Sequence, residues 1–321
     1  MIPYDAHVDP CHRYEDSYAG LPVTEVIPGQ DKEIPDPGAA ALRISCGWND
    51  WTFDEAFAAL LDRVDTTLVP ALVIGGWDDC SSDSSEHVVG LLADNATRFP
   101  GLRSIFLGAI SFEESEISWI KQSDVTPLLE AFPLLERLEV RGGDGLALRP
   151  VRHERLRMLR FETGGLPGEV ARAVGACDLP ALQHLELWLG IEEYGGNATV
   201  ADLAPILSGE SLPALRHLGL QDSEIQDEIA TAVASAPVVA RLESLALSMG
   251  VLTDDGAEAL LGGQPLTHLR RLDLHHHFLG DEMMSRVAEA LPGVEVNLSD
   301  QQTPESDEWL DEDSLYVAVS E

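Results

Sequence analysis

Seven arginines gather within residues 137–160 of a chain that is otherwise strongly acidic. They lie at positions 137, 141, 149, 152, 155, 157 and 160, beside Glu139, Asp144 and Glu154. The segment carries a net charge of +4, within a chain of net charge −36. A guanidinium group can bind a carboxylate or phosphate through two parallel hydrogen bonds, so the segment is a candidate anion site. The alternative is that these arginines pair with nearby acidic residues and stabilise a long loop.

Three consecutive histidines, His275-His276-His277, raise the question of a metal site. Neighbouring residues on a strand point to opposite faces, so only His275 joins Asp273 on one side. His277 falls in a turn, where it can satisfy backbone groups. His217 lies two strands away, about 10 Å, which is too far to share an ion. We therefore predict no metal site.

The chain shows no pattern that is typical of an enzyme or of cofactor binding. Residues 141–145 are rich in glycine but lack the Lys-Ser/Thr pair of a phosphate loop, and they read as a turn. No cysteine or serine lies in a motif with a histidine base, and no pair of acids has a glycosidase-like context. We expect neither catalysis nor a cofactor.

Charge and composition exclude several classes of partner. The chain has 321 residues, with 56 acidic against 20 basic, and 45% of its residues are hydrophobic, as in a globular protein. Such an excess of negative charge argues against nucleic acids and anionic membranes as partners. The N-terminal residues show no signal-peptide pattern, and no apolar run approaches the ~18 residues of a membrane helix. We expect a cytoplasmic protein.

An internal repeat of the form LxxLxL predicts the architecture. Copies begin at residues 102, 135, 156, 182, 215, 242 and 269, so they are 33, 21, 26, 33, 27 and 27 residues apart. Within a copy the last two leucines are two residues apart and point to one side of a short strand, and a helical stretch follows. These features predict an α/β leucine-rich-repeat solenoid: a curved horseshoe with parallel strands on its concave face and helices on its convex face.

The residues between the leucines are predicted to form polar columns on the concave face. We expect the face to be solvated and to bind a protein partner, because repeat solenoids mostly act through it. The predicted partner-binding residues are Arg137, Glu139, Arg141, Arg160, Glu162, His184, Glu186, Trp188, His217, Gln221, Arg271, Asp273 and His275. Trp119 lies outside these columns, and we expect it in the core of a repeat.

Four segments are predicted along the chain. Residues 1–38 form a partly disordered N-terminal segment, and residues 39–101 form an N-terminal cap of irregular repeat-like α/β units. Residues 102–298 form the solenoid. Residues 299–321 hold eight acidic groups and no Lys or Arg, and they are predicted to be an acidic C-terminal tail.

Several longer stretches resemble a known family. They are VDTTLVPALVIGGW (64–77), EISWIKQSDVTPLLEAFP (116–133), VRGGDGLALRPVRH (140–153), LQHLELWLGIEEYGG (182–196), LRHLGLQDSEIQDEIA (215–230) and LRRLDLHHHFL (269–279). From about Leu21 to Leu298 the chain resembles a bacterial family of cytoplasmic leucine-rich-repeat proteins of uncharacterised function, with repeats similar to those of ribonuclease inhibitor. Members are often encoded near radical-SAM proteins. The resemblance implies an accessory role in a biosynthetic or modification pathway and supplies no catalytic residues.

Three functional hypotheses remain open at this point. The first is a non-enzymatic scaffold that holds a protein partner on the concave face, and the negative charge favours a partner with a basic surface. The second is a module that binds a small anion, or assists an enzyme, through the arginines of residues 137–160. The third is that the charge reflects a composition bias and indicates no partner. The oligomeric state stays open.

Overall fold

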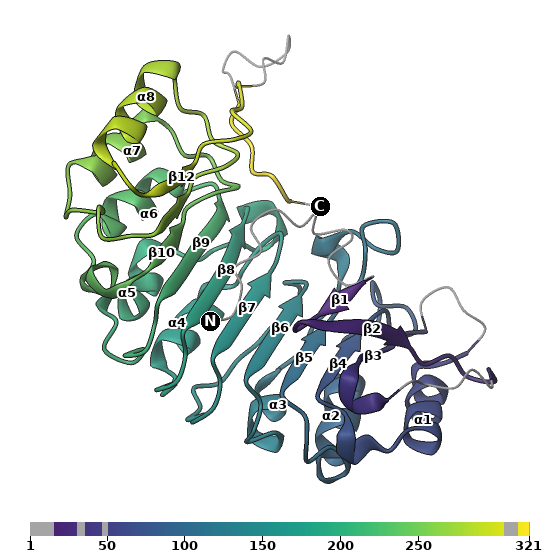
Figure 1. Ribbon diagram of the computed structural model, residues 1–321. Coiled ribbons are helices and arrows are strands. Elements are labelled where there is room, and N and C mark those ends of the chain that lie inside the picture. The colour runs from purple at the N-terminus through teal and green to yellow at the C-terminus, as the bar shows by residue number, and fades with distance from the viewer. Residues whose placement is uncertain (1–15, 31–35, 47–50, 305–313, 321) are drawn as a thin grey trace. The chain divides into compact units, whose positions relative to one another are not determined.

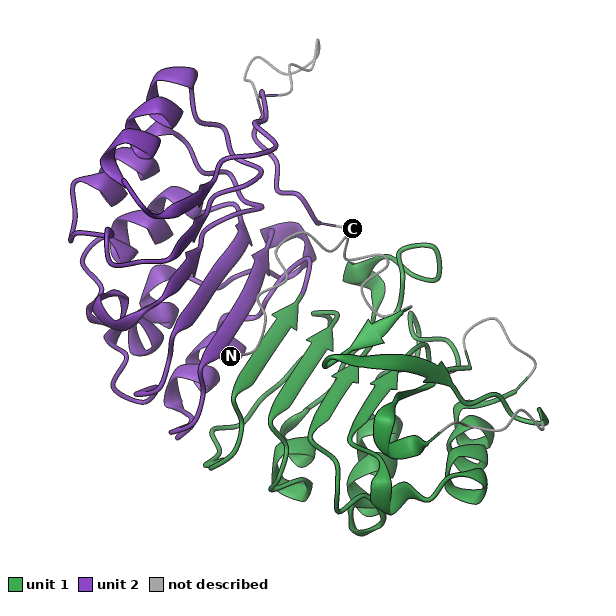
Figure 2. Cartoon of the chain, in the orientation of Figure 1, with its two compact units in different colours: residues 1–162, 321 green, residues 163–320 purple. Residues whose placement is uncertain are grey.

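The computed structural model describes residues 16–30, 36–46, 51–304 and 314–320 (Figure 1). The chain divides into two compact units, one of residues 1–162 with residue 321 and one of residues 163–320 (Figure 2). This boundary falls inside the segment predicted as one solenoid. No helix among the described residues is long and apolar enough to cross a membrane.

The first unit contains a sheet in which the strands follow one another in chain order. Strand β2 and the strands after it run parallel, and β1 pairs antiparallel with β2. The strands are β1 (Ser17–Tyr18), β2 (Leu21–Glu25), β3 (Ala41–Ile44), β4 (Ala71–Ile74), β5 (Ser104–Leu107), β6 (Arg137–Arg141) and β7 (Met158–Glu162). The connections contain α1 (Phe53–Arg63), α2 (Glu86–Asp94) and α3 (Thr126–Ala131).

The second unit repeats a parallel strand-and-helix arrangement. Its strands are β8 (His184–Gly190), β9 (His217–Ser223), β10 (Ser244–Ala246), β11 (Arg271–Asp273) and β12 (Glu295–Asn297), and each pairs parallel with the next. Its helices are α4 (Gly168–Ala176), α5 (Val200–Ser208), α6 (Gln226–Val233), α7 (Asp254–Leu261) and α8 (Asp281–Ala290). The prediction of an α/β chain with parallel strands is confirmed within each unit.

The repeat leucines form the core between strands and helices. Leu185, Leu187, Leu218 and Leu220 are completely buried, as the two-residue spacing of LxxLxL requires. The helices begin at local signals: before α1, Thr52 and Glu55 form a reciprocal capping box, which satisfies backbone N–H groups that the first helical turn leaves without acceptors. The positions of the core leucines and the start of α1 therefore follow from local sequence, whereas their burial comes from the packing of strands against helices.

A short hairpin that the sequence analysis did not predict packs against the first sheet. Strands β1 and β2 lie within residues 1–38 and are joined by Ala19 and Gly20, both with positive φ, as in the tight turns of hairpins. Tyr18 is buried, its ring centroid 5.9 Å from that of Phe106. The Arg137 guanidinium lies 5.1 Å from the centre of the same ring. The hairpin thus covers Phe106, which alternation alone would leave facing solvent.

The end of the chain also packs against the second unit. Within the predicted acidic tail, residues 299–304 and 314–320 are described, whereas residues 305–313 lie outside the described part. The Ala318 N–H donates to the Met249 carbonyl (2.8 Å) and the Val319 N–H to Asp222 Oδ1 (2.9 Å). These bonds join residues 314–320 to the end of β9 and to the loop that follows β10.

Candidate functional site

The strand register within each unit aligns the polar columns as the repeat predicts. In the first unit Glu139 lies beside Arg160 and Arg141 beside Glu162. In the second unit the aligned pairs include His184 with His217, Glu186 with Gly219, Trp188 with Gln221, Ser244 with Arg271, and Ala246 with Asp273. The alignment follows from a side-chain period of two residues and from leucines that hold neighbouring strands in register.

The exposure of these columns differs from the expectation of a solvated face. Ten predicted partner-binding residues are buried: Glu139, Arg141, Arg160, Glu162, His184, Glu186, Trp188, His217, Gln221 and Asp273. Arg137, Arg271 and His275 are half-buried. Alternation specifies which side of a strand a residue takes, but whether other chain segments cover that side depends on tertiary packing.

The three arginines of β6 and β7 form an internal ion-pair network rather than an open anion site. Arg160 Nη1 lies 3.0 Å from Glu139 Oε2 and 3.6 Å from Glu162 Oε1. Arg141 binds Glu162 Oε2 through Nε and Nη2, at 3.0 and 2.9 Å. Arg137 pairs with Glu139. An anionic ligand here would have to compete with carboxylates that are already in place.

Three exposed arginines of the same segment are paired as well. Arg149 binds Asp124, Arg152 binds Glu154 and Arg157 approaches Glu136. This arrangement agrees with the alternative interpretation of residues 137–160, in which the arginines pair with nearby acidic residues.

The three consecutive histidines have separate local partners. His275 Nδ1 lies 2.8 Å from Asp273 Oδ1, and His276 Nε2 lies 3.1 Å from the Tyr316 carbonyl. His277 accepts from the Leu279 N–H and lies 3.2 Å from the Leu298 carbonyl, which is the predicted role of satisfying backbone groups. Burial lowers the pKa of His277 below its usual value, which favours the neutral ring.

A different polar cluster lies on β8 and β9. His184, Glu186 and His217 each offer one ligand atom, and these three atoms all lie within 4.8 Å of one another. The polar columns predicted from the repeat place all three residues on one face, but their clustering was not predicted. The sequence feature that could have predicted this cluster is the strand register, because it places His184 and Glu186 of one repeat beside His217 of the next.

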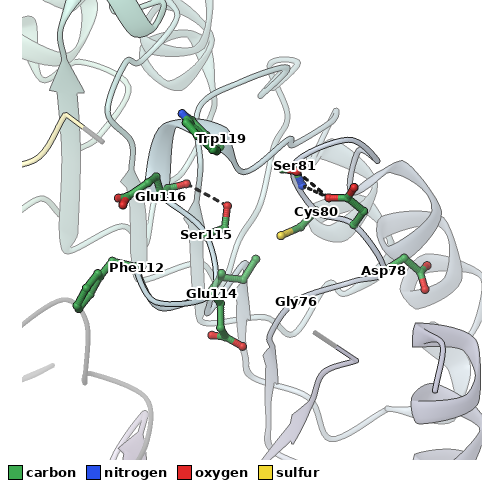
Figure 3. Close-up of a pocket in the computed structure, with 11 residues that line it drawn as sticks. Gly76, Asp78, Cys80, Ser81, Phe112, Glu114, Ser115, Glu116 and Trp119 are labelled. Carbon is green, nitrogen blue, oxygen red and sulfur yellow. Dashed lines mark hydrogen bonds between the residues drawn. The ribbon is translucent and has the colours of Figure 1, made fainter. Parts of the chain in front are cut away.

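A pocket of about 530 Å³ opens where β4 and β5 end. Its walls come from the loop after β4 and the loop after β5, and Figure 3 shows Asp78, Cys80 and Ser81 opposite Glu114, Ser115 and Glu116. Gly76, Asp79, Ile110, Phe112 and Trp119 complete the lining.

Two large aromatic side chains at this pocket are exposed. Trp119 is 57% exposed and Phe112 is 53% exposed. The prediction that Trp119 belongs to the core is wrong. The short helical turn Ile117–Trp119 directs Ile117 and Ile120 inward, so the side chain of Trp119 remains outside.

The pocket lining is negatively charged. It includes Asp78, Asp79, Glu114 and Glu116, and no Lys, Arg or His is among the described lining residues. Outside the lining, Arg43 Nη2 lies 3.8 Å from Glu114 Oε1. Hydrogen bonds from Ser81 and Ser82 lower the pKa of Asp79, so this carboxylate is ionised at neutral pH. Glu114 Oε2 accepts from the Ser111 N–H (2.9 Å) and hydroxyl (3.0 Å), which orients its carboxylate.

The cysteine of the pocket lacks the environment of a nucleophile. Burial raises the pKa of Cys80, with only a partial opposing effect from the Ser115 hydroxyl. A thiol with a raised pKa is mostly protonated at neutral pH, and the thiolate is the reactive form. The raised pKa therefore gives no support to Cys80 as a nucleophile.

Comparison with solved structures relates the chain to a bacterial protein. A crystal structure of a protein from Bacteroides fragilis matches at 30% sequence identity and a TM-score of 0.73, over 81% of this chain and 74% of that one. The chain belongs to the same family as this Bacteroides fragilis protein. An internalin from Listeria monocytogenes matches at 16% identity and a TM-score of 0.39, over 76% of this chain and 57% of that one, a likeness too low to carry an argument. No family profile and no curated protein matches the chain significantly.

Proposed function

We propose that this chain is a non-enzymatic protein-interaction scaffold, built as a leucine-rich-repeat solenoid, that binds a basic segment of a partner protein in the pocket at β4 and β5. The parallel strand-and-helix units and the LxxLxL spacing support the solenoid. The sequence predicted that the partner would bind on the face of the strands, but the polar residues of that face are buried. We therefore propose that the partner binds at the ends of β4 and β5. The accessory role and the cytoplasmic location implied by the family resemblance belong to the same proposal.

The observation that carries the proposal is the pairing of exposed aromatic rings with carboxylates around one pocket. Exposed apolar patches rimmed by polar residues are characteristic of binding surfaces, and here Trp119 and Phe112 share a pocket with four carboxylates. A Lys or Arg cation over an aromatic face contributes about 0.5–1 kcal/mol where exposed, and about 2 kcal/mol when water is excluded. Pockets of ~300–1,000 Å³ commonly take ligands, so a pocket of about 530 Å³ has room for a long basic side chain.

Charge complementarity selects the kind of partner. The four carboxylates of the lining and the chain's net charge of −36 both attract cations. Such fields raise association rates and exclude acidic partners. The opposite hypothesis, a small anion bound by the arginines of residues 137–160, gains no support from arginines that are already bound to carboxylates.

Labelled peptides that differ in a single central residue test the proposal. We expect peptides with a central Arg or Lys to bind more tightly than those with norleucine or Glu, and to bind more weakly as ionic strength rises. Trp119→Ala should weaken the binding of the Arg peptide about tenfold, equivalent to ~1.4 kcal/mol. Leu68→Ala is the matched control, since Leu68 is 52% exposed in the same unit but outside the pocket.

Two results would refute the proposed site. One is equal binding of the Arg peptide by the wild-type protein and the Trp119→Ala variant. The other is equal binding of the Arg and Glu peptides. Inorganic phosphate serves as the probe for the anion hypothesis: an increase in melting temperature that Arg160→Met abolishes would favour that hypothesis instead.

A further inference from the structure

The side chains of His184, Glu186 and His217 converge on one side of β8 and β9. His184 and Glu186 are two residues apart on β8, and His217 is the strand partner of His184 on β9. His184 Nε2 lies 3.0 Å from Glu186 Oε2, and the two imidazole rings stack with their centroids 4.1 Å apart. All three side chains are buried.

Neighbouring side chains contact His217 and Glu186 at the atoms that point away from the cluster. The other ring nitrogen of His217, Nδ1, lies 2.7 Å from Ser244 Oγ, which makes Nε2 the atom of that ring that can serve as a ligand. The Trp188 indole N–H donates to Glu186 Oε1 at 3.4 Å, on the oxygen that does not face His184. Metal-binding histidines and carboxylates are typically oriented by such outer contacts, which set the tautomer and the ring direction.

The chemistry of the three groups suits a divalent transition metal ion. Imidazole nitrogens and a carboxylate oxygen are ligands of Zn²⁺ and of similar ions, and two histidines with one carboxylate recur in catalytic zinc sites. Removing a carboxylate from water is unfavourable unless a cation or hydrogen bonds compensate. An ion with two positive charges would neutralise Glu186 and would leave both imidazoles in the neutral form that binds metals.

We propose that His184 Nε2, Glu186 Oε2 and His217 Nε2 bind one zinc-class divalent ion. Metal–ligand bonds of about 2.0–2.1 Å place tetrahedral ligands about 3.4 Å apart, and the ligand atoms of the three residues lie within 4.8 Å of one another. Binding therefore requires side-chain rotations that close this gap and turn the two stacked rings so that both nitrogens point at the ion. Three protein ligands leave a fourth position for water or another ligand. We predicted no metal site because His217 and His275 are two strands apart. That prediction did not take into account that His217 lies beside His184 on β8.

Metal titration of the full chain tests the site. The protein is stripped with a chelator and titrated with Zn²⁺ by calorimetry, and with Co²⁺ by visible absorption. We expect one equivalent of tight binding and a Co²⁺ spectrum of tetrahedral intensity. Glu186→Gln and His217→Phe should each weaken Zn²⁺ binding more than about 100-fold, because each removes a direct ligand, whereas losing a second-shell contact costs about 10–100-fold.

Three further variants make the result specific. Ser244→Ala leaves all three ligands in place and should weaken Zn²⁺ binding about tenfold, through loss of the His217 orientation. His268→Ala is the matched control, since this histidine of the same unit bonds to the Val239 carbonyl and lies outside the cluster. His275→Ala tests the competing histidine run.

The outcomes separate the proposal from its alternatives. Absence of stoichiometric Zn²⁺ or Co²⁺ binding by the folded wild-type protein would overturn the site and leave the cluster as an internal hydrogen-bonded group. Binding that survives Glu186→Gln and His217→Phe but is lost in His275→Ala would overturn it as well. If both ligand variants fail to fold, the Ser244→Ala result decides, because unchanged affinity there refutes the assigned ligand orientation. Peptide binding at the pocket of the first unit is a separate readout.

Discussion

The ion-pair network of β6 and β7 allows a prediction of how much the free energy of unfolding changes when one charge of the network is removed. Among the described residues, the guanidinium groups of Arg137, Arg141 and Arg160 face the carboxylates of Glu139 and Glu162. The network therefore carries three positive and two negative charges. Glu162 is completely buried and is bound by both Arg141 and Arg160.

Replacing Glu162 by Gln should destabilise the first unit more than replacing Arg160 by Met. Among the described residues, Glu162→Gln keeps the shape but leaves the buried Arg141 and Arg160 and the half-buried Arg137 against one carboxylate. We therefore expect the upper part of the about 3–5 kcal/mol range measured for breaking buried pairs. Arg160→Met leaves two cations and two carboxylates, and Met retains part of the apolar stem. We expect a loss of about 3 kcal/mol or less for that variant.

Urea unfolding of the purified variants, followed by circular dichroism, measures both free energies. Arg152→Ala is the control, because the exposed pair that Arg152 forms with Glu154 should contribute at most about 1 kcal/mol. Two results would refute the reasoning. One is a loss below about 1 kcal/mol for Glu162→Gln; the other is a larger loss for Arg160→Met than for Glu162→Gln.

Three further predictions concern packing and pH. Burial raises the pKa of Asp222, so the contribution of this residue to stability is present at low pH and is lost as pH rises through the raised pKa. Asp222→Asn should remove this pH dependence and stabilise the protein at pH 8 by about 1–3 kcal/mol. Urea unfolding at pH 5 and pH 8 measures both effects. Tyr18→Ala should lower the free energy of unfolding by about 3–5 kcal/mol through lost packing on Phe106, whereas Tyr18→Phe should retain most of it in the same assay. Gly190→Ala should lower the melting temperature markedly, because Gly190 has φ +65° and a Cβ there would meet the Gly164 carbonyl oxygen. Gly195→Ala is the control for backbone strain without a steric clash, because Gly195 also has a positive φ but faces open space.

Much of the local structure could be predicted because it depends on short-range periodicity. The helical stretches expected after the repeat strands include α7 (Asp254–Leu261) after β10 and α8 (Asp281–Ala290) after β11. The strand positions and their register follow from leucines that repeat every two residues within a strand and about every 27 residues between strands. Each of these signals is contained within one repeat or in the spacing between two.

The candidate sites were less predictable because they depend on which surfaces are covered. Alternation places Glu139 and His184 on the polar side of their strands, and both are buried instead. Trp119 was expected in the core, but the local turn exposes it at the pocket that the loops after β4 and β5 form. Exposure is a property of distant segments that pack together, and a hydrophobic pattern within one repeat contains no information on it.

Periodicity thus specifies strands, helices and the residues that share a column, because a period of two or of 3.6 residues is a property of the backbone. The β1–β2 hairpin over Phe106, the pairing of Arg160 with Glu139 and Glu162, and the meeting of Glu186 with His217 required the folded chain. Their physical cause is desolvation. Once tertiary packing excludes water from one face of a strand, each polar group on that face must find a partner across the sheet.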